Sequence, residues 1–538
     1  MTGPDLRPGE RFGVRLFDAL DYFALAHPDS LFARSEENGG ISISYADAAD
    51  ATRRIANGIC NRELAQGDRV AILARNRLDL VLLYYGCARA GVVPVPLNYR
   101  LAPPEWSYIV NDSGARAMFA TAELAQALEP VRSELASVDQ WFELDGTADH
   151  GGWEAYPDWV ASQSNTPCPR HIDGASDAYQ MYTSGTTGRP KGAVVAHNAV
   201  ASNAQQVQLS LDVAPSDCML VVAPLYHAAA GIVVFTTISQ GGSLFIQEDF
   251  VPAEAVRAMS EEGISKALLV PAMIQACLVA VPDVAERPYD ELATVVYGAS
   301  PIAVETLRRA MDVFGCDFIQ GYGMTETTAV LTNLTAADHV LALAEGGRPD
   351  LLLSAGRAVL GTEVRIVDEN DEPVPNGVVG EICGRGPQLM RGYWNLPEAT
   401  EAALKGGWMH TGDAGILDDD GYLYVQDRVK DMIVSGGENI YPREIEDALY
   451  EHPAIAEAAV IGIPDERFGE TVKAVVALKD GETASAEELV AFCRERLAGY
   501  KQPRSVDFVE ELPRNPSGKV LKRELREPYW VGRDRQVS

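Results

Sequence analysis

The stretch that decides the fold reads YTSGTTGRPKG and runs from Tyr182 to Gly192. It places four serine and threonine side chains and three glycines just before and around Lys191. Glycine lets the backbone approach a ligand closely, hydroxyls and backbone N–H groups can surround a phosphate, and lysine adds a positive charge. It is not a Walker A loop, because Arg189 and Pro190 separate Gly188 from the lysine. The spacing predicts a phosphate-binding loop, and a surface turn rich in Ser, Thr and Gly is the plain alternative.

The composition of the chain excludes some classes of structure and of partner. The chain has 538 residues, of which 47% are hydrophobic and 23% charged, as is usual for a globular protein of several domains. Its formal net charge of −32 disfavours nucleic acid and anionic membranes as partners. The N-terminal stretch has no apolar core of a signal peptide, and the apolar run 228–238 is short of the ~18 residues of a membrane span. We expect a cytoplasmic protein without a membrane span.

The eight cysteines give no sign of a metal site. No C-x-x-C pair occurs, and the eight histidines form no H-x-x-x-H pair. We therefore expect reduced thiols in the core of a cytosolic protein.

Helices and strands alternate through the first part of the chain. The patterns predict helices over 49–64 and 78–90 and strands over 69–74 and 91–95. Such alternation is typical of α/β layers around mostly parallel sheets. After about Gly356, short β-rich runs separated by Asn-Gly and Asp-Gly turns predict a small antiparallel, barrel-like part.

A second change of pattern follows the charged stretch 427–431. Beyond it we expect a helix over 442–450, strands over 459–463 and 472–478, and a helix that Ser485 and Glu488 begin as a capping box. The prediction is a large N-terminal α/β domain of residues 1–429 and a smaller α+β domain of residues 430–538.

Further motifs follow the phosphate loop in a fixed order. They are PLYH (224–227), YGASP (297–301), QGYGMTE (320–326), TGD (411–413), DR (427–428), SGGENIY (435–441) and PRNPSGK (513–519). Together with residues 182–192 they resemble the signature of the adenylate-forming superfamily, which includes acyl-CoA synthetases, adenylation domains of peptide synthetases and beetle luciferases. The resemblance is to the acyl-CoA ligase branch.

That resemblance implies a two-step reaction. A carboxylate attacks the α-phosphate of ATP to give an acyl-adenylate and diphosphate, and the thiol of CoA then displaces AMP. The resemblance implies ATP and CoA as co-substrates and Mg²⁺ as the metal cofactor. It also implies that residues 1–429 form the AMP-binding domain and that residues 430–538 form a mobile domain. Because two anions meet in the first step, its catalysis rests on positioning and charge neutralisation.

The resemblance also implies which residues bind the nucleotide. The catalytic groups would be Thr183, Lys191, Glu326 and Lys519, with Glu326 as the Mg²⁺ ligand. The ATP and AMP contacts would be Thr183, Ser184, Gly185, Thr186, Thr187, Gly188, Lys191, Gly298, Ala299, Ser300, Gln320, Gly321, Tyr322, Gly323, Met324, Thr325, Asp413, Arg428 and Lys519.

The same resemblance assigns roles in the second step. Lys430 would be the hinge about which the C-terminal domain swings. CoA would then contact Ser435, Gly436, Gly437 and Tyr500. Gln502 stands where some relatives carry arginine, so this sequence departs from the family in its contact to the CoA phosphate.

The acid itself is left open by the sequence. The acyl pocket implied by the family is lined by Tyr226, His227, Ala228, Gly231, Gly298, Gly321, Gly323 and Met324. The run 227–234 has no carboxylate, which disfavours an amino acid, and Gly323 is small where acetate-specific relatives carry tryptophan. Both a medium- or long-chain fatty acid and an aryl or arylpropenoic acid of feruloyl type fit this lining.

Three other functions compete with the CoA ligase. A stand-alone adenylation enzyme would load a carrier protein. A non-enzymatic sensor of nucleotide or acyl groups would be expected to have lost Lys519, Glu326 or Lys191, and all three are present. A luciferase-type oxygenase would carry a lysine near Val434. A homodimer is possible.

Overall fold

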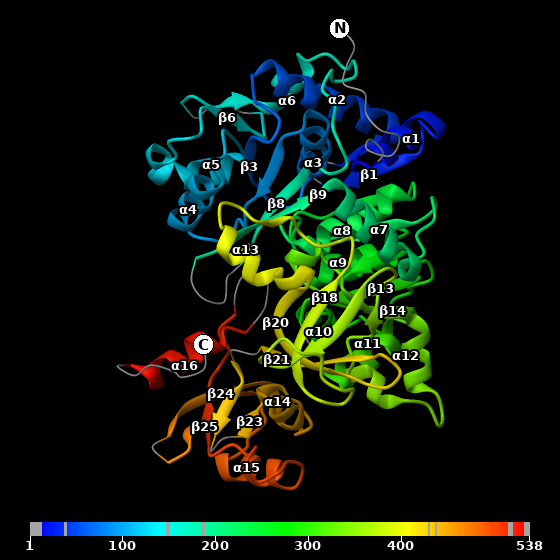
Figure 1. Cartoon of the computed structure of the whole chain (residues 1–538). Coiled ribbons are helices and arrows are strands. Elements are labelled where there is room, and N and C mark those ends of the chain that lie inside the picture. The colour runs from blue at the N-terminus through cyan, green and yellow to red at the C-terminus, as the bar shows by residue number, and fades with distance from the viewer. Residues whose placement is uncertain are drawn as a thin grey trace.

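A computed structural model of the protein describes most of the chain (Figure 1). The described residues are 13–36, 40–146, 151–183, 189–300, 302–428, 431–435, 438–465, 467–514 and 520–531, with only the backbone described at 427–428 and 438–439. The α/β class predicted from the sequence is confirmed.

The largest sheet has nine strands and a parallel centre. Its order is β16 (Arg357–Ala358), β15 (Thr332–Leu334), β14 (Asp317–Tyr322), β13 (Thr294–Gly298), β12 (Lys266–Leu268), β10 (Cys218–Val221), β11 (Ser243–Ile246), β1 (Leu31–Ser35) and β2 (Ile41–Ser44). Pairing is parallel from β14 through β1 and antiparallel at both edges. The helices that alternate with its strands are α7 (His197–Leu211), α8 (Ala228–Ser239), α9 (Pro252–Glu261), α10 (Pro271–Ala280), α11 (Val304–Phe314) and α12 (Ala336–Leu343).

A second sheet, parallel throughout, forms the part drawn in blue and cyan (Figure 1). Its strands are β4 (Val93–Pro96), β3 (Arg69–Leu73), β5 (Ala117–Ala120), β6 (Gln140–Glu143) and β7 (Glu154–Ala155). The helices of this region are α1 (Asp18–Ala26), α2 (Tyr45–Asn61), α3 (Leu78–Ala90), α4 (Pro103–Ser113), α5 (Ala122–Leu128) and α6 (Tyr156–Ala161).

Helices α3 and α8 join the two parallel sheets through one shared core. Both are apolar around nearly their whole circumference, as a helix enclosed on all sides must be. Tyr84 of α3 packs edge-on against Phe235 of α8, with ring centroids 5.6 Å apart, and donates its hydroxyl hydrogen to Leu225 O. The two sheets therefore cannot shift independently without opening this core.

Smaller antiparallel sheets complete the structure. One contains β8 (Asp177–Thr183), β9 (Lys191–Ala196) and β19 (Gly392–Tyr393), and another contains β17 (Glu363–Val367), β18 (Gly380–Arg385), β20 (Met409–Leu417) and β21 (Leu423–Arg428). The latter is the antiparallel part predicted after Gly356. Helix α13 (Pro397–Ala403) lies beside β19.

The last part of the chain builds its own sheet and core, at the bottom of the view (Figure 1). Its strands are β23 (Glu438–Ile440), β22 (Ile433–Ser435), β25 (Gly469–Leu478), β24 (Ile455–Asp465) and β26 (Ser505–Phe508), and its helices α14 (Pro442–Tyr450), α15 (Ala486–Arg494) and α16 (Lys522–Trp530). The capping box of Ser485 and Glu488 is present. The boundary at residue 430 stays a prediction, because residues 429–430 lie outside the described part.

Several sequence expectations differ from the structure. β4 begins at Val93 rather than at residue 91, and β24 and β25 begin before the expected residues 459 and 472. Helix α2 starts at Tyr45 rather than near residue 49, because Ser44 and Asp47 form a capping box that the apolar pattern does not reveal. Cys60, Cys168 and Cys316 are half-buried, so the expectation of core thiols is wrong for these three. Among the described helices, none has the length and apolar character needed to cross a membrane.

His197 makes the stability of this fold depend on pH. It is fully buried at the start of α7, and burial lowers the pKa of its imidazole to about 4. An unfolded histidine titrates near 6.5, so between these values the unfolded state binds more protons and the folded state loses stability as pH falls.

We expect the free energy of unfolding to fall by about 2 kcal/mol more in the wild type than in His197→Gln between pH 7 and pH 5. Urea titrations at both pH values measure this difference. The matched control is His171→Gln, because His171 is exposed. An equal pH dependence in wild type and His197→Gln would contradict the prediction.

Candidate active site

A cavity of about 690 Å³ lies where the carboxyl ends of β13 and β14 meet β8, β9, α7, α8 and β20. In open α/β sheets this edge is the usual place for a ligand. Among the predicted site residues, those that line it are Thr183, Lys191, Tyr226, His227, Ala228, Gly298, Ala299, Gly321, Gly323, Met324, Thr325 and Glu326.

Other predicted residues have different positions. Ser300, Gln320, Tyr322, Asp413, Gly231, Ser435 and Tyr500 are described but do not line the cavity. Ser184, Gly185, Thr186, Thr187, Gly188, Lys430, Gly436, Gly437 and Lys519 lie outside the described residues, as does the side chain of Arg428.

Gly231 lies on the side of α8 that faces the protein core. A Cβ atom at this position would contact the Phe235 ring at 3.4 Å and the Met181 side chain at 3.7 Å. Helical periodicity directs Ala228 and Ile232 into the cavity instead.

Glu326 provides a buried carboxylate in the cavity. It lies in the short 3₁₀ turn Thr325–Thr327 and is only 4% exposed. The Tyr393 hydroxyl donates a hydrogen bond of 2.7 Å to its Oε1, and the Lys191 ammonium lies 5.0 Å from the centre of the Tyr393 ring. A carboxylate, a phenol and an ammonium group therefore meet here, an arrangement that suits a phosphate together with a divalent cation.

Sequence reasoning missed Tyr393, which is 67 positions away from Glu326. Only the pairing of β19 with β9, which sets Tyr393 opposite Ala193, brings the phenol to the carboxylate. No motif in the sequence signals this contact.

Asp413 and Tyr322 form a second polar pair beside the cavity. The Tyr322 hydroxyl donates a hydrogen bond of 2.7 Å to Asp413 Oδ2, and the aspartate is buried. The backbone N–H of Asp413 donates to Thr411 Oγ1 after a turn at Gly412, which has φ of 69°. In the pairing of β20 with β21, Asp413 stands opposite Arg428. The aspartate is thereby fixed in orientation at the cavity edge.

Glycines bring backbone segments together along the cavity wall. A Cβ at Gly298 would come within 2.2 Å of Gly321 O, and a Cβ at Gly323 within 2.1 Å of Ala329 O. Glycine at 323 is thus required by backbone packing and does not by itself measure pocket depth. The next residue after Gly298, Ala299, has φ of 63°, a strained conformation of the kind that concentrates at functional sites.

Most of the remaining wall is apolar. Its members come from α7, α8, β13 and β14 and include Val207, Leu211, Ala229, Ile232, Val233, Val296 and Ile319. Within it lie Ser210 and Asn333, whose side chains are joined by a hydrogen bond of 3.1 Å from Asn333 Nδ2 to Ser210 Oγ. The buried Tyr226 hydroxyl also lines the cavity and has no hydrogen-bond partner among the described residues.

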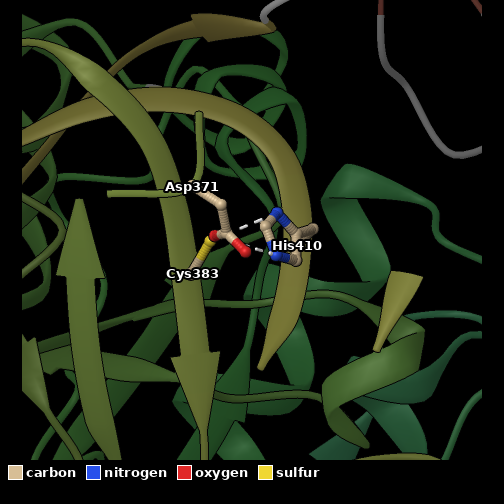
Figure 2. A group of neighbouring side chains, drawn as sticks. All are labelled: Asp371, Cys383 and His410. Carbon is tan, nitrogen blue, oxygen red and sulfur yellow. Dashed lines mark hydrogen bonds and ion pairs between the residues drawn. The ribbon is translucent and has the colours of Figure 1, made fainter. Parts of the chain in front are cut away.

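A separate cluster of possible metal ligands lies at the edge of the cavity, formed by Asp371, Cys383 and His410 (Figure 2). His410 Nε2 lies 3.5 Å from Asp371 Oδ1. Asp371 is already paired with Arg365 at 3.1 Å and Lys405 at 3.3 Å. Because cations already surround this carboxylate, the cluster is better described as an ion-pair network than as a metal site.

A cavity at the carboxyl ends of parallel strands, lined by a lysine and a buried carboxylate, is typical of α/β enzymes that bind phosphorylated ligands. A family model described as AMP-binding enzyme matches residues 20–394, and one described as AMP-binding enzyme C-terminal domain matches residues 444–519. The chain belongs to this family of adenylate-forming enzymes.

Similar proteins indicate which reaction of this family the chain catalyses. The chain is 40% identical to a feruloyl-CoA synthase of an Amycolatopsis species, covering 92% of this chain and 96% of the relative. It is 36% identical to a long-chain-fatty-acid–CoA ligase of Mycobacterium tuberculosis, covering 93% and 95%. The ATP-bound structure of MatB from Rhodopseudomonas palustris superposes with a TM-score of 0.86 at 29% identity, covering 96% and 99%. The protein is an AMP-forming acyl-CoA synthetase that uses ATP and acts on a fatty or aryl acid.

The bond between Tyr322 and Asp413 gives a testable consequence. In Tyr322→Phe the ring stays but the donor that orients Asp413 is lost, so we expect KM for ATP to rise about 3- to 10-fold while KM for the acid changes little. Steady-state kinetics in which ATP and the acid are varied in turn measure the two KM values. The control is Tyr424→Phe, which removes a hydroxyl bonded to Asp350 at 2.9 Å on the surface. Equal increases in both KM values would mean that the bond only supports the fold.

Proposed function

We propose that the acid activated by this synthetase is an arylpropenoic acid whose ring carries a hydroxyl group, of feruloyl type. The observation that carries the proposal is the Ser210–Asn333 pair within the apolar wall of the cavity. The similarity to a feruloyl-CoA synthase supports the same choice.

Asn333 is well placed to receive such a hydroxyl. It is 8% exposed, and its Oδ1 lies 3.7 Å from where a Cβ of Gly321 would be, so the amide reaches the wall through the space that glycine leaves. Its Nδ2 is engaged by Ser210, and no described residue donates to Oδ1. An amide oxygen that loses water without gaining a donor costs about 1–3 kcal/mol, so an alkyl chain is disfavoured there and a phenolic hydroxyl is favoured.

Ser210 and Asn333 also mark a boundary of the cavity. Both line a second cavity of about 230 Å³, whose other members include Gln206, Asp338 and Arg357. A group held by the pair therefore sits where the acyl cavity ends and a more polar space begins, which suits the substituted edge of an aromatic ring.

For the nucleotide, we propose that Thr183 and Lys191 contact the β- and γ-phosphates together with residues 184–188. Thr325 would donate to the α-phosphate, and Asp413 would accept the ribose hydroxyls, held in place by Tyr322. Glu326 is the proposed ligand of Mg²⁺, since Tyr393 donates to Oε1 and no described residue donates to Oε2. The bound ion would supply charge neutralisation at the phosphate oxygens.

These positions support the two half-reactions. The acid's carboxylate oxygen bonds to the α-phosphorus of ATP, and diphosphate leaves with its negative charge near Lys191. The CoA sulfur then bonds to the acyl carbon and AMP leaves. We propose that residues 430–538 swing about Lys430 between the steps, so that Ser435, Gly436, Gly437 and Tyr500 contact CoA. Tyr500 is 45% exposed and available for such a contact.

The substitution Asn333→Leu tests the choice of acid. We expect kcat/KM for ferulic acid to fall about 10-fold, because the hydroxyl loses its acceptor, while kcat/KM for cinnamic acid stays the same or rises. Asn370→Leu on the exposed surface is the control. If kcat/KM for ferulic acid fell selectively in Tyr226→Phe but not in Asn333→Leu, the phenolic hydroxyl of the substrate would bind at Tyr226 and the assignment to Asn333 would be wrong. A wild type that prefers alkyl acids to both aryl acids would overturn the choice of acid and leave the ligase activity intact.

A second substitution separates the half-reactions. If Lys519 bridges the carboxylate and the α-phosphate, Lys519→Ala lowers the rate of acyl-adenylate formation about 10²- to 10³-fold but still converts supplied acyl-adenylate and CoA to thioester. Lys479→Ala, an exposed lysine of the same part of the chain, is the control. Equal losses in both half-reactions would refute the role.

The acceptor of the acyl group can be determined in the same assay. Thioester formation with free CoA supports the CoA ligase, whereas diphosphate release without CoA turnover and acylation of a carrier protein would support the alternative. A homodimer and a cytoplasmic location stay predictions.

A further inference from the structure

Two cysteines that are 108 positions apart are in contact on the side of the five-stranded sheet. Cys60 lies one residue before the end of α2, and Cys168 lies in the segment 162–176 between α6 and β8. Their sulfur atoms are 3.1 Å apart, and both side chains are half-buried. Neither residue lines the active-site cavity.

The contact is held by bonds that do not involve the sulfurs. Asn57 Nδ2 on α2 donates to Ser164 O at 2.8 Å and to Thr166 O at 2.7 Å. Beyond Cys168, Arg170 Nη1 donates to Ala90 O at 2.8 Å. These hydrogen bonds attach the segment to α2 and to the end of α3 on both sides of Cys168, so the two sulfurs stay together without a covalent bond.

The two thiols are chemically unequal. The hydrogen bond between the two sulfurs is the largest effect on Cys168 and lowers the pKa of its thiol, although burial opposes this shift. The backbone N–H and the charge of Arg170 lower the pKa further. The same hydrogen bond and burial raise the pKa of Cys60. Because the Arg170 N–H and charge also favour a thiolate at Cys168, we assign Cys168 as the attacking thiol and Cys60 as the thiol that resolves the intermediate.

We propose that Cys60 and Cys168 form a reversible disulfide when the protein meets a peroxide. The Cys168 thiolate attacks one peroxide oxygen, the O–O bond breaks, and hydroxide (or alkoxide) leaves, giving a sulfenic acid. The Cys60 sulfur then attacks the Cys168 sulfur, an S–S bond forms, and the departing hydroxide takes the Cys60 proton to give water. Two thiols are oxidised and one peroxide is reduced, and a dithiol reverses the change by thiol–disulfide exchange.

The bond would enclose a complete structural unit. The loop that it closes contains β3, β4, β5, β6 and β7, which are all the strands of the five-stranded sheet. Linking the entry and exit of a loop of this size restricts the unfolded chain and stabilises the folded one. We therefore expect oxidation to raise the melting temperature of this part of the protein, by about 5 °C on the usual scale for such loops.

Cysteine mapping of the full-length protein tests the proposal directly. The protein is treated with hydrogen peroxide at stoichiometric concentrations, and non-reducing peptide mass spectrometry follows the peptides with Cys60 and Cys168. The expected result is one linked peptide pair, lighter by about 2 Da than the sum of the reduced peptides. Dithiothreitol should restore the reduced masses and the original melting temperature.

Variants assign the roles of the two sulfurs. In Cys60→Ser the serine hydroxyl can still donate to Cys168, but no thiol resolves the sulfenic acid, so dimedone should label Cys168. In Cys168→Ser no label should appear on Cys60. Cys316→Ser is the matched control, because Cys316 is also half-buried, but burial raises the pKa of its thiol to about 12. This variant should form the disulfide as the wild type does.

The test of the disulfide can fail without affecting the proposed function, because disulfide formation and synthetase activity are measured separately. Reduced Cys60→Ser and Cys168→Ser should keep wild-type synthetase activity, since neither residue touches the cavity. The proposal is overturned if peroxide oxidises Cys316 as fast as Cys168. It is also overturned if Cys168 proceeds to sulfinic acid without linking to Cys60, or if the linked protein melts no higher than the reduced one.

Discussion

The site depends on a backbone contact between two parallel strands. Gly298 at the end of β13 and Gly321 in β14 approach so closely that a Cβ on Gly298 would come within 2.2 Å of the Gly321 carbonyl oxygen. This approach leaves the carboxyl ends of both strands free of side-chain bulk where the cavity opens. Ala299 follows immediately with φ of 63°, a strained conformation at the cavity wall.

Different sheets and helices supply the charged and the apolar side chains around this wall. The small antiparallel sheet of β8, β9 and β19 carries Lys191 and Tyr393, and the sheet with β20 carries Asp413. The apolar surface comes from α7 and α8, which pack on the nine-stranded sheet. The charged and the apolar parts of the cavity wall therefore come from different elements, and α8 of the apolar part shares its core with α3 of the neighbouring region.

Much of this arrangement follows from the sequence, within clear limits. The α/β class, the antiparallel part after Gly356 and the adenylate-forming family were predicted correctly, because strand and helix periodicity and ordered motifs are local properties. The ends of α3 and α14 were also predicted to the residue. Gly231 was expected in the acyl pocket, whereas it does not line the described cavity and lies beside Phe235. Tyr393, Ser210 and Asn333 carry no local signal, and they were missed.

The sequence by itself determined the family and the class of reaction, because ordered motifs with fixed internal spacing are local properties of the chain. Only the tertiary structure decided that Tyr393 bonds to Glu326, that Asn333 faces the acyl cavity, and that Cys60 touches Cys168. Each of these pairs is made by strand pairing or by packing between segments far apart in the chain. Such contacts depend on how whole sheets and helices stack, and no spacing within a single segment encodes that.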